Sequence, residues 1–330
     1  MTTIAIEQAS VANLFEIQVP KGVLIQRFVD ASHPQIPTAT SEYVFRKELV
    51  REMRDFLMFP RGDAMFISGP TGSGKTSLVT EFCARLNWPV QEITCNGRME
   101  VADMIGHHAL VSQAPGQPPV MQFMHGPLAM AMKEGHVLLL NEIDMLDPAE
   151  LSGLNDVLEG RPLVIAQNGG EVIKPHANFR VIATGNSLGS GDATGLYQGV
   201  SMQSMAAMDR FRFMIVGYAD PEVEEGILMK ESSDLGEDVI KKMVRVANEI
   251  RSLFMGEGES GGELSLTMST RVLRRWARQA IAFRGSKNAD GERNALSYAL
   301  HMALLRRASP EEQVAVLQLA KSVFGDIWHD

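Results

Sequence analysis

The residues best suited to chemistry form one short glycine-rich stretch. Residues 69–76 read G-P-T-G-S-G-K-T, which fits the pattern G-x-x-x-x-G-K-[ST]. Glycines let successive backbone N–H groups converge on phosphate oxygens, and a helix that starts there adds partial positive charge. We predict that Lys75 reaches the β and γ phosphates of a nucleotide and that the Thr76 hydroxyl ligates Mg²⁺. The members of this predicted phosphate loop are Gly69, Pro70, Thr71, Gly72, Ser73, Gly74, Lys75 and Thr76.

A second polar pair follows an apolar run. Residues 136–140 are followed by Asn141 and Glu142. Chains with this kind of loop usually carry an aspartate and then a glutamate there, and the aspartate helps to hold Mg²⁺. We predict that Asn141 takes this metal-binding position with a weaker grip, because an amide oxygen brings no negative charge to a hard cation. Glu142 is the candidate that orients or deprotonates an attacking water.

Asn141 leaves two alternatives open. The chain could hydrolyse a nucleoside triphosphate with a weakened hold on Mg²⁺, or it could act as a nucleotide switch with slow turnover. We favour hydrolysis, because the other parts that hydrolysis requires are present. We interpret Asp144 as a turn or helix-cap residue before Pro148.

Five short apolar runs between Ala64 and Val216 alternate with helical segments. They are apolar on both faces, as strands in a covered parallel sheet must be. We therefore predict an α/β domain of the doubly wound type with a five-stranded parallel sheet, in which the phosphate loop joins the first strand to a helix. The predicted strands cover 64–68, 90–94, 136–140, 179–184 and 212–216.

The flanking segments have other patterns. Residues 1–42 contain several prolines and favour an extended arm laid over the main domain, and a helix is expected from Glu42 to just before Pro60. Strand signals stop after Pro221. We predict three parts: the arm (1–42), the nucleotide-binding domain (43–220) and a small all-α lid (221–330). The predicted lid helices cover 221–230, 236–255, 270–283, 290–307 and 310–323.

Composition narrows the class of protein. The 330 residues are 45% hydrophobic and 22% charged, with a net charge of −9 that disfavours a dedicated nucleic-acid binder. Cys83 and Cys95 are too few for a disulfide framework, and we interpret both as buried. No apolar run approaches the roughly 20 residues that span a bilayer, and no signal peptide is evident. We expect a cytoplasmic protein with no membrane partner.

The motifs, taken in order, resemble those of AAA+ ATPases. Besides the phosphate loop and Asn141-Glu142, the matching stretches are 183–186, 208–211 and 269–271. The resemblance implies that Asn186 positions the water and senses the γ-phosphate. It also implies that Arg210 acts on the nucleotide of a neighbouring subunit and that Arg271 contacts the same phosphates. The alternative for Arg210 is a structural ion pair, in which case Arg212 would act on the neighbouring nucleotide instead. The alternative for Arg271 is an ordinary position on the surface of a helix.

Two predicted hairpins, within 104–128 and 163–173, resemble insertions of the MoxR and chelatase branch, and most closely those of ATPase subunits of aerobic cobaltochelatases. The segments 85–89 and 189–199 carry the same resemblance. It implies ATP and Mg²⁺ as cofactors and a homo-oligomeric ring, expected to be a hexamer. It further implies a partner with a von Willebrand factor A domain, which ATP hydrolysis would remodel or drive, and an output such as metal insertion into a corrinoid.

Other signals favour ordinary structural roles. A nucleic-acid translocase or helicase and a slowly hydrolysing scaffold remain the competing functions. Most methionines are expected to fill the core, although Met121 and Met124 could face a central pore. The histidines match no compact metal motif, and we interpret them as surface hairpin residues: His107, His108, His125 and His136.

Overall fold

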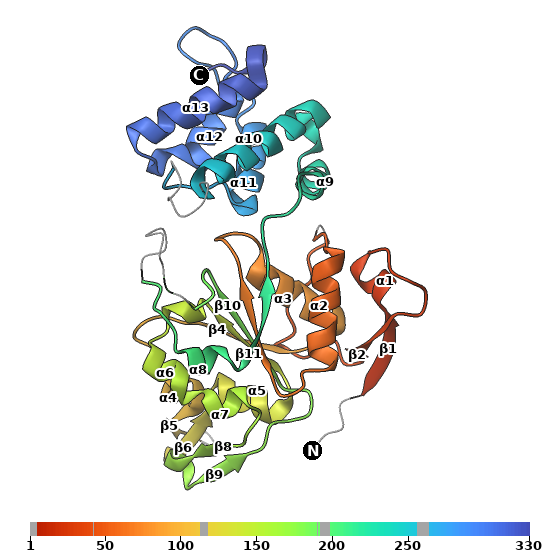
Figure 1. Ribbon diagram of the computed structural model, residues 1–330, viewed down its shortest axis with the longest axis vertical. Coiled ribbons are helices and arrows are strands. Elements are labelled where there is room, and N and C mark those ends of the chain that lie inside the picture. Colours follow the sequence, from red (N-terminus) through yellow and green to blue (C-terminus); the bar gives the residue numbers. More distant parts are fainter. Residues whose placement is uncertain (1–4, 42, 113–117, 190, 192–198, 256–263) are drawn as a thin grey trace. The chain divides into compact units, whose positions relative to one another are not determined.

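The computed structural model describes residues 5–41, 43–112, 118–189, 191, 199–255 and 264–330. These residues fall into two compact units, whose main boundary in sequence lies between Val216 and Gly217. Two short stretches before that boundary, residues 43–44 and Thr71–Gly74, are grouped with the second unit. The strands β3, β4, β7, β10 and β11, between residues 64 and 215, belong to unit 1, and the helices α9 to α13, between residues 221 and 324, belong to unit 2 (Figure 1).

Unit 1 is built on a five-stranded parallel sheet in the order β11-β3-β10-β7-β4. Every residue of β3, β7 and β10 is buried, as expected for a sheet with helices on both faces. The predicted fold class is therefore confirmed. The strands are β3 (Ala64–Ser68), β4 (Val90–Thr94), β7 (Val137–Asn141), β10 (Arg180–Gly185) and β11 (Phe211–Ile215).

Helices cover both faces of this sheet. On one face Arg212 of β11 donates to Asp55 at 2.8 Å and Arg180 of β10 donates to the Leu57 carbonyl, which places α2 there. On the other face Phe66 and Leu138 belong to one apolar core with α5, α6 and α7. The helices are α2 (Lys47–Met58), α3 (Lys75–Leu86), α5 (Pro127–Glu134), α6 (Pro148–Gly153), α7 (Asn155–Leu158) and α8 (Met205–Met208).

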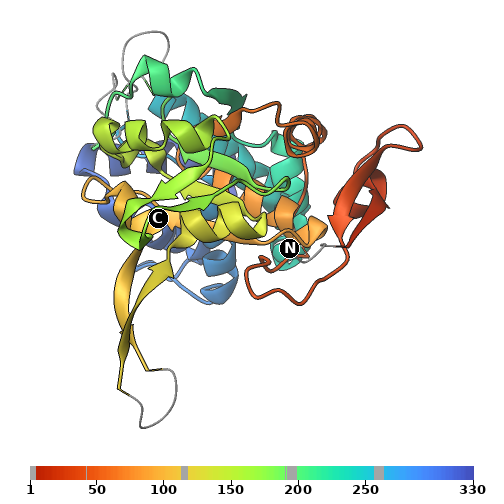
Figure 2. The same ribbon diagram turned by 90° about the horizontal axis from the view of Figure 1, so that it is seen from below.

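Two antiparallel hairpins are inserted, as predicted. The first, β5 (Gly106–Val111) with β6 (Val120–His125), follows the short helix α4 (Val101–Ile105) and projects from unit 1 (Figure 2). The second pairs β8 (Leu163–Ile165) with β9 (Glu171–Ile173). His125 Nε2 lies 2.7 Å from Glu171 Oε2, which ties the two hairpins together.

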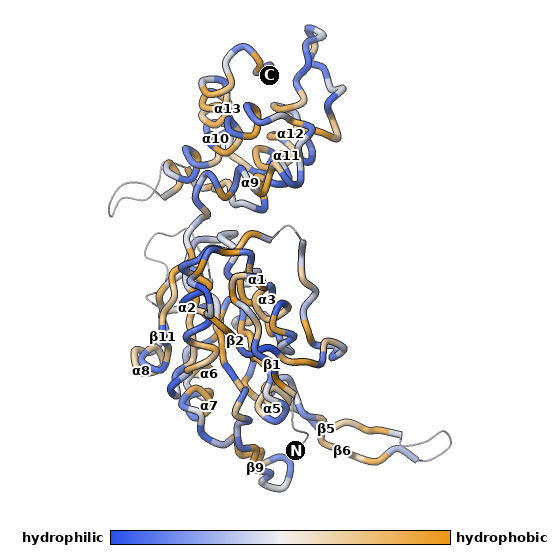
Figure 3. Tube along the Cα trace, turned by 90° about the vertical axis from the view of Figure 1, so that its right-hand side faces the viewer, coloured by the Kyte–Doolittle hydropathy of each residue, from blue (hydrophilic) through white to orange (hydrophobic). Residues whose placement is uncertain are grey.

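Hydrophobic residues lie along both strands of the first hairpin (Figure 3), and several of them are exposed. Leu110 is 66% exposed and Met121 64%, and Met124 is also exposed. These two methionines are the ones that were excepted from core filling on the basis of the sequence, and they are exposed. Exposed apolar residues on a projecting hairpin are typical of a surface that contacts another protein.

The N-terminal arm is more regular than predicted. β1 (Ile6–Ser10) and β2 (Leu24–Phe28) pair antiparallel, and α1 (Val11–Phe15) lies between them. Val11 and Phe15 are four residues apart, so one turn of helix buries both on one side. The Phe15 ring stacks on Phe82 of α3 at 4.3 Å between centroids, which anchors the arm on unit 1.

Unit 2 is helical, as predicted for the lid. Its core surrounds the buried Trp276, and a buried ion pair joins Arg251 to Glu224 at 2.7 and 2.8 Å. In the described part of the chain, no helix is long and apolar enough to span a membrane. The helices are α9 (Pro221–Glu231), α10 (Glu237–Met255), α11 (Thr270–Ala282), α12 (Ala295–Ala303) and α13 (Pro310–Phe324).

Candidate nucleotide site

The carboxyl ends of three adjacent strands bring the predicted site residues of unit 1 together. Lys75 Nζ donates to Asn186 Oδ1 at 2.9 Å, and Thr76 Oγ1 donates to Asn141 Oδ1 at 2.8 Å. β3 leads into α3 through the phosphate loop, and β7 and β10 end at Asn141 and Gly185. Ligands of open α/β sheets bind outside the carboxyl ends of the strands, which is where these contacts lie.

The conformation of the phosphate loop requires glycine at two positions. Gly72 and Gly74 have φ angles of +75° and +93°, a region that side chains with a Cβ rarely enter. α3 begins directly after them, at Lys75. The first N–H groups of a helix have no partner within the helix, so this end of α3 is suited to bind an anion.

The Lys75 ammonium is held by three oxygen acceptors. Besides Asn186, Nζ donates to the carbonyls of Gly69 at 2.7 Å and Pro70 at 3.1 Å. Burial lowers the pKa of Lys75 to about 8, while the negative charges of Asp144 and Glu142 oppose this shift. A phosphate group at this position would favour the charged form of the lysine.

Asn141 is buried and uses both ends of its amide. Oδ1 accepts from the Thr76 hydroxyl and also from the Thr184 hydroxyl at 3.1 Å. Nδ2 donates to Oε1 of Glu92, a residue of β4, at 2.6 Å. The sequence interpretation anticipated neither Thr184 nor Glu92, because each contact joins two different strands.

Glu142 follows β7 with a left-handed backbone, φ 55° and ψ 44°. Its N–H donates to Thr184 Oγ1 at 3.3 Å, and its side chain is exposed to solvent. A carboxylate in this position, directly beside Asn141, can contact a water molecule that approaches the site from solvent.

Asp144 has a different role from the one predicted. It lies in a 3₁₀ turn, Ile143–Met145, with no exposed surface, and its Oδ2 accepts the N–H groups of Asn186 at 2.7 Å and Ser187 at 3.2 Å. The residue that caps α6 is Asp147, which accepts from the Ala149 N–H. Asp144 therefore lies in a turn, as predicted, and fixes the backbone that carries Asn186, whereas the helix-cap interpretation is wrong.

The two candidate arginines of unit 1 both form ion pairs within the subunit. Arg210, just after α8, donates from Nε to Glu159 Oε1 at 2.7 Å and also contacts the Ala206 carbonyl. Arg212 pairs with Asp55 and with Asp63, at 2.8 and 3.1 Å. These pairs hold the Arg212 guanidinium on the α2 side of the sheet, which argues against it as a substitute for Arg210.

Arg271 belongs to unit 2. It is the second residue of α11 and is exposed, and Ser269 caps the helix by accepting from the Val272 N–H at 3.2 Å. Its neighbours Arg274 and Arg278 both pair with Glu231. Its predicted contact with the nucleotide stays a prediction.

The structure confirms the interpretation of the two cysteines and corrects that of one histidine. Cys83 and Cys95 are buried, as predicted, and burial raises the pKa of Cys95 to about 12. His136 is not a surface residue: it is buried at the start of β7, and burial together with nearby His33 and His176 lowers its pKa to about 4. His136 is buried because it directly precedes β7, a strand in which every residue is buried.

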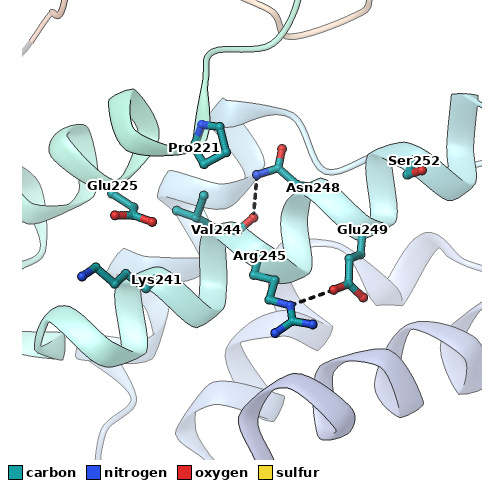
Figure 4. Close-up of a pocket in the computed structure, with 8 residues that line it drawn as sticks. All are labelled: Pro221, Glu225, Lys241, Val244, Arg245, Asn248, Glu249 and Ser252. Atoms are coloured by element: carbon teal, nitrogen blue, oxygen red, sulfur yellow. Dashed lines mark hydrogen bonds and ion pairs between the residues drawn. The ribbon is translucent and has the colours of Figure 1, made fainter.

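A groove on unit 2 lies along α9 and α10 (Figure 4). Its charged side chains pair one helical turn apart, as in the 2.9 Å contact between Arg245 and Glu249. It contains no buried polar group directed at a ligand. The candidate site is therefore the region of unit 1 at the carboxyl ends of β3, β7 and β10.

Comparison with known proteins agrees with this geometry. Residues 64–211 match the model of the AAA domain of the dynein-related subfamily, and residues 224–323 match that of the CbbQ/NirQ/NorQ C-terminal family. The aerobic cobaltochelatase subunit CobS of Sinorhizobium sp is 28% identical over 295 residues, 88% of this chain and 83% of that protein. An uncharacterized protein of Staphylococcus aureus (strain USA300) is 30% identical over 196 residues, 59% of this chain and 71% of that one.

A mutant of RuvB from Thermotoga maritima is a distant structural neighbour. Its TM-score is 0.48 at 15% identity, over 81% of this chain and 73% of that chain. At that score the likeness supports no conclusion. The sheet, the phosphate loop, the two family matches and the relatives together show that the chain belongs to the AAA+ ATPases of the MoxR and chelatase branch.

Proposed function

We propose that this protein binds Mg²⁺-ATP, hydrolyses it, and uses the cycle to remodel or drive a partner protein. The observation that carries the proposal is the pair of contacts at the carboxyl ends of the strands, where Lys75 donates to Asn186 and Thr76 donates to Asn141. The exposed Glu142 directly follows Asn141. Lys75 and Asn186 would hold the γ-phosphate and the attacking water, and Glu142 would accept the proton of that water.

The donor set fits Mg²⁺, a hard cation that takes oxygen ligands and keeps several waters. The Thr76 hydroxyl and the Asn141 amide oxygen, 2.8 Å apart, are both oxygen donors beside the phosphate loop. Bound there, the ion would neutralise charge on the β and γ phosphates.

The family implies assembly with other protein chains, and we propose a hexameric ring of this chain. Arg210 would leave Glu159 and act on the nucleotide of the neighbouring subunit, where an arginine supplied in trans accelerates hydrolysis by about 10³-fold or more. Arg271 would contact the phosphates from unit 2. We propose a partner with a von Willebrand factor A domain, and the exposed side chains of the first hairpin support a protein as partner.

Glu142→Gln tests the proposal, because it removes the base and keeps the size of the side chain. We expect ATP binding within about threefold of the unaltered protein and hydrolysis reduced about 10²-fold or more. Phosphate release and equilibrium binding measure the two effects. Glu134→Gln, an exposed glutamate of α5, is the matched control. Absence of hydrolysis in the unaltered protein would favour a nucleotide-gated scaffold, and salt-sensitive stimulation by DNA would favour a translocase.

A mixing experiment tests the ring. Arg210→Ala and Glu142→Gln subunits should each be inactive alone. In mixed rings, some interfaces combine Glu142 of one subunit with Arg210 of its neighbour, so ATPase activity should return. If mixing restores no activity, Arg210 does not act in trans.

A further inference from the structure

The Asn141 side chain carries no negative charge, yet it contacts a carboxylate on the neighbouring strand. Glu92 of β4 accepts a hydrogen bond from Asn141 Nδ2 at 2.6 Å. β4 is the edge strand beside β7, and Glu92 is exposed. The acceptor for the Asn141 amide nitrogen thus comes from β4, and not from the phosphate loop or from β7.

The pairing of the two strands explains how these side chains meet. β4 runs parallel to β7, with Thr94 opposite Asn141 and Glu92 opposite Leu139. Residues paired across a sheet, and residues two apart along a strand, point to the same face. Glu92 and Asn141 therefore share the face on which α3 carries Thr76.

Glu92 also determines which way the Asn141 amide points. An ionised carboxylate can only accept hydrogen bonds, so the amide nitrogen must face Glu92. The amide oxygen then faces the hydroxyl of Thr76. If the amide turned over, it would present N–H groups to the position where a cation needs oxygen.

The hydrogen bond to a carboxylate also alters the charge on the amide. Bonds to an ionised acceptor are stronger than bonds between neutral groups, and bonds in a chain polarise one another. The chain Glu92–Asn141–Thr76 consists of contacts of 2.6 and 2.8 Å. Negative charge on Glu92 therefore increases the negative character of the oxygen that faces Thr76.

We propose that Glu92 is a positioning residue that supplies, through the Asn141 amide, the negative charge that the Asn141 side chain lacks, and thereby strengthens the hold on Mg²⁺ at the nucleotide site. The inference rests on the proposed function, because it concerns the metal of the same site. The charge is placed on the neighbouring strand instead of at the end of β7.

Glu92→Gln separates charge from hydrogen bonding. Glutamine keeps an oxygen that can accept from Asn141 Nδ2, so a purely structural role would survive the change. With hydrolysis blocked by Glu142→Gln, ATP binding is measured by fluorescence while Mg²⁺ is titrated. We expect the half-saturating Mg²⁺ concentration to rise about tenfold, which is typical for loss of an outer partner of a metal ligand. Binding without Mg²⁺ should not change, and Glu134→Gln should match the parent.

Asn141→Asp provides the second arm. It places two carboxylates where the side chains now lie 2.6 Å apart, and like charges at that distance repel. Alone, it should not improve Mg²⁺ binding and should lower the melting temperature. Combined with Glu92→Gln, it restores one charge and one hydrogen bond with donor and acceptor exchanged. The double variant should bind Mg²⁺ at least as tightly as the parent.

The outcomes separate this inference from the proposed function. If Glu92→Gln has the same Mg²⁺ titration as the parent, or if the double variant is no better than Glu92→Gln alone, the role of Glu92 is wrong and the proposed function stands. If the parent binds no ATP, or binds it independently of Mg²⁺, the proposed function fails and the role of Glu92 fails with it.

Discussion

The candidate site has two halves, one around Lys75 and one around Asn141, and the carboxylates that contact them differ in burial. In the phosphate half, Lys75 and Asn186 are supported by Asp144, a carboxylate with no exposed surface. In the half proposed to bind the metal, Thr76 donates to Asn141, and Asn141 donates to Glu92, an exposed carboxylate. In the role proposed for Glu92, a carboxylate missing from the end of one strand is offset by a carboxylate on the neighbouring strand, which the motif does not include.

The difference in burial predicts a difference in sensitivity. A buried charge that loses its partners costs several times more free energy than an exposed one, because water cannot replace the lost contacts. Changes in the phosphate half should therefore affect both folding and turnover, whereas Glu92→Gln should affect mainly Mg²⁺ binding.

The largest effect is expected for Lys75→Ala. The change removes the only cationic side chain of the phosphate loop, so ATP affinity should fall by about 10²-fold or more. Isothermal titration calorimetry measures the affinity. Lys133→Ala, an exposed lysine of α5, should leave it unchanged. Equal affinity for Lys75→Ala and the unaltered protein would show that the nucleotide binds elsewhere.

Asp144→Asn should have the next largest effect. The amide is a weaker acceptor for the N–H groups of Asn186 and Ser187, so the free energy of unfolding should fall by about 1–3 kcal/mol. Misplacement of Asn186 should reduce the turnover rate by about tenfold. Urea denaturation and phosphate release measure the two effects.

Asp147→Asn is a control three residues away. Asparagine caps a helix about as well as aspartate, so the cap of α6 should survive. If Asp144→Asn were as mild as Asp147→Asn, the phosphate half would not depend on a buried charge.

The smallest expected effect is a pH dependence of ATP binding. Burial lowers the pKa of Lys75 to about 8, and bound phosphates would raise it again. The complex therefore binds more protons than the unliganded protein above pH 8, so affinity should fall by up to tenfold per pH unit there and stay nearly constant below pH 7. Titrations in buffers of different ionisation enthalpy should show proton uptake near pH 8. Lys75→Arg, which stays charged, should lose this dependence.

The sequence predicts well those features that depend on local patterns. The strand, the glycine turn and the helix at 64–86 follow from residue types that are adjacent in the chain. The hairpin at 163–173 follows from the turn glycines Gly169 and Gly170, both with positive φ. The arm helix Val11–Phe15 was missed, because it is stabilised by packing against Phe82 instead of by its own sequence.

The contacts between strands could not be predicted. Glu92 and Asn141 are 49 residues apart, and their meeting depends on the exact register of β4 and β7. The pairing of Arg210 with Glu159, 51 residues away, likewise depends on tertiary structure, because it joins the residue before β11 to the end of α7. The cap role of Asp144 was wrongly predicted because a carboxylate shortly before a proline that starts a helix is typical of a cap residue, and only the structure shows that Asp144 is buried and accepts from the Asn186 N–H.

At Glu142 the backbone conformation that lowers the stability of the fold coincides with the carboxylate that the proposed turnover requires. Its left-handed conformation costs a residue with a Cβ on the order of 1 kcal/mol, whereas glycine would adopt it without cost. Glycine, however, would remove the carboxylate that the proposed chemistry needs. The chain therefore keeps a locally unfavourable residue here, at the point where β7 ends and where the Glu142 side chain is exposed to solvent.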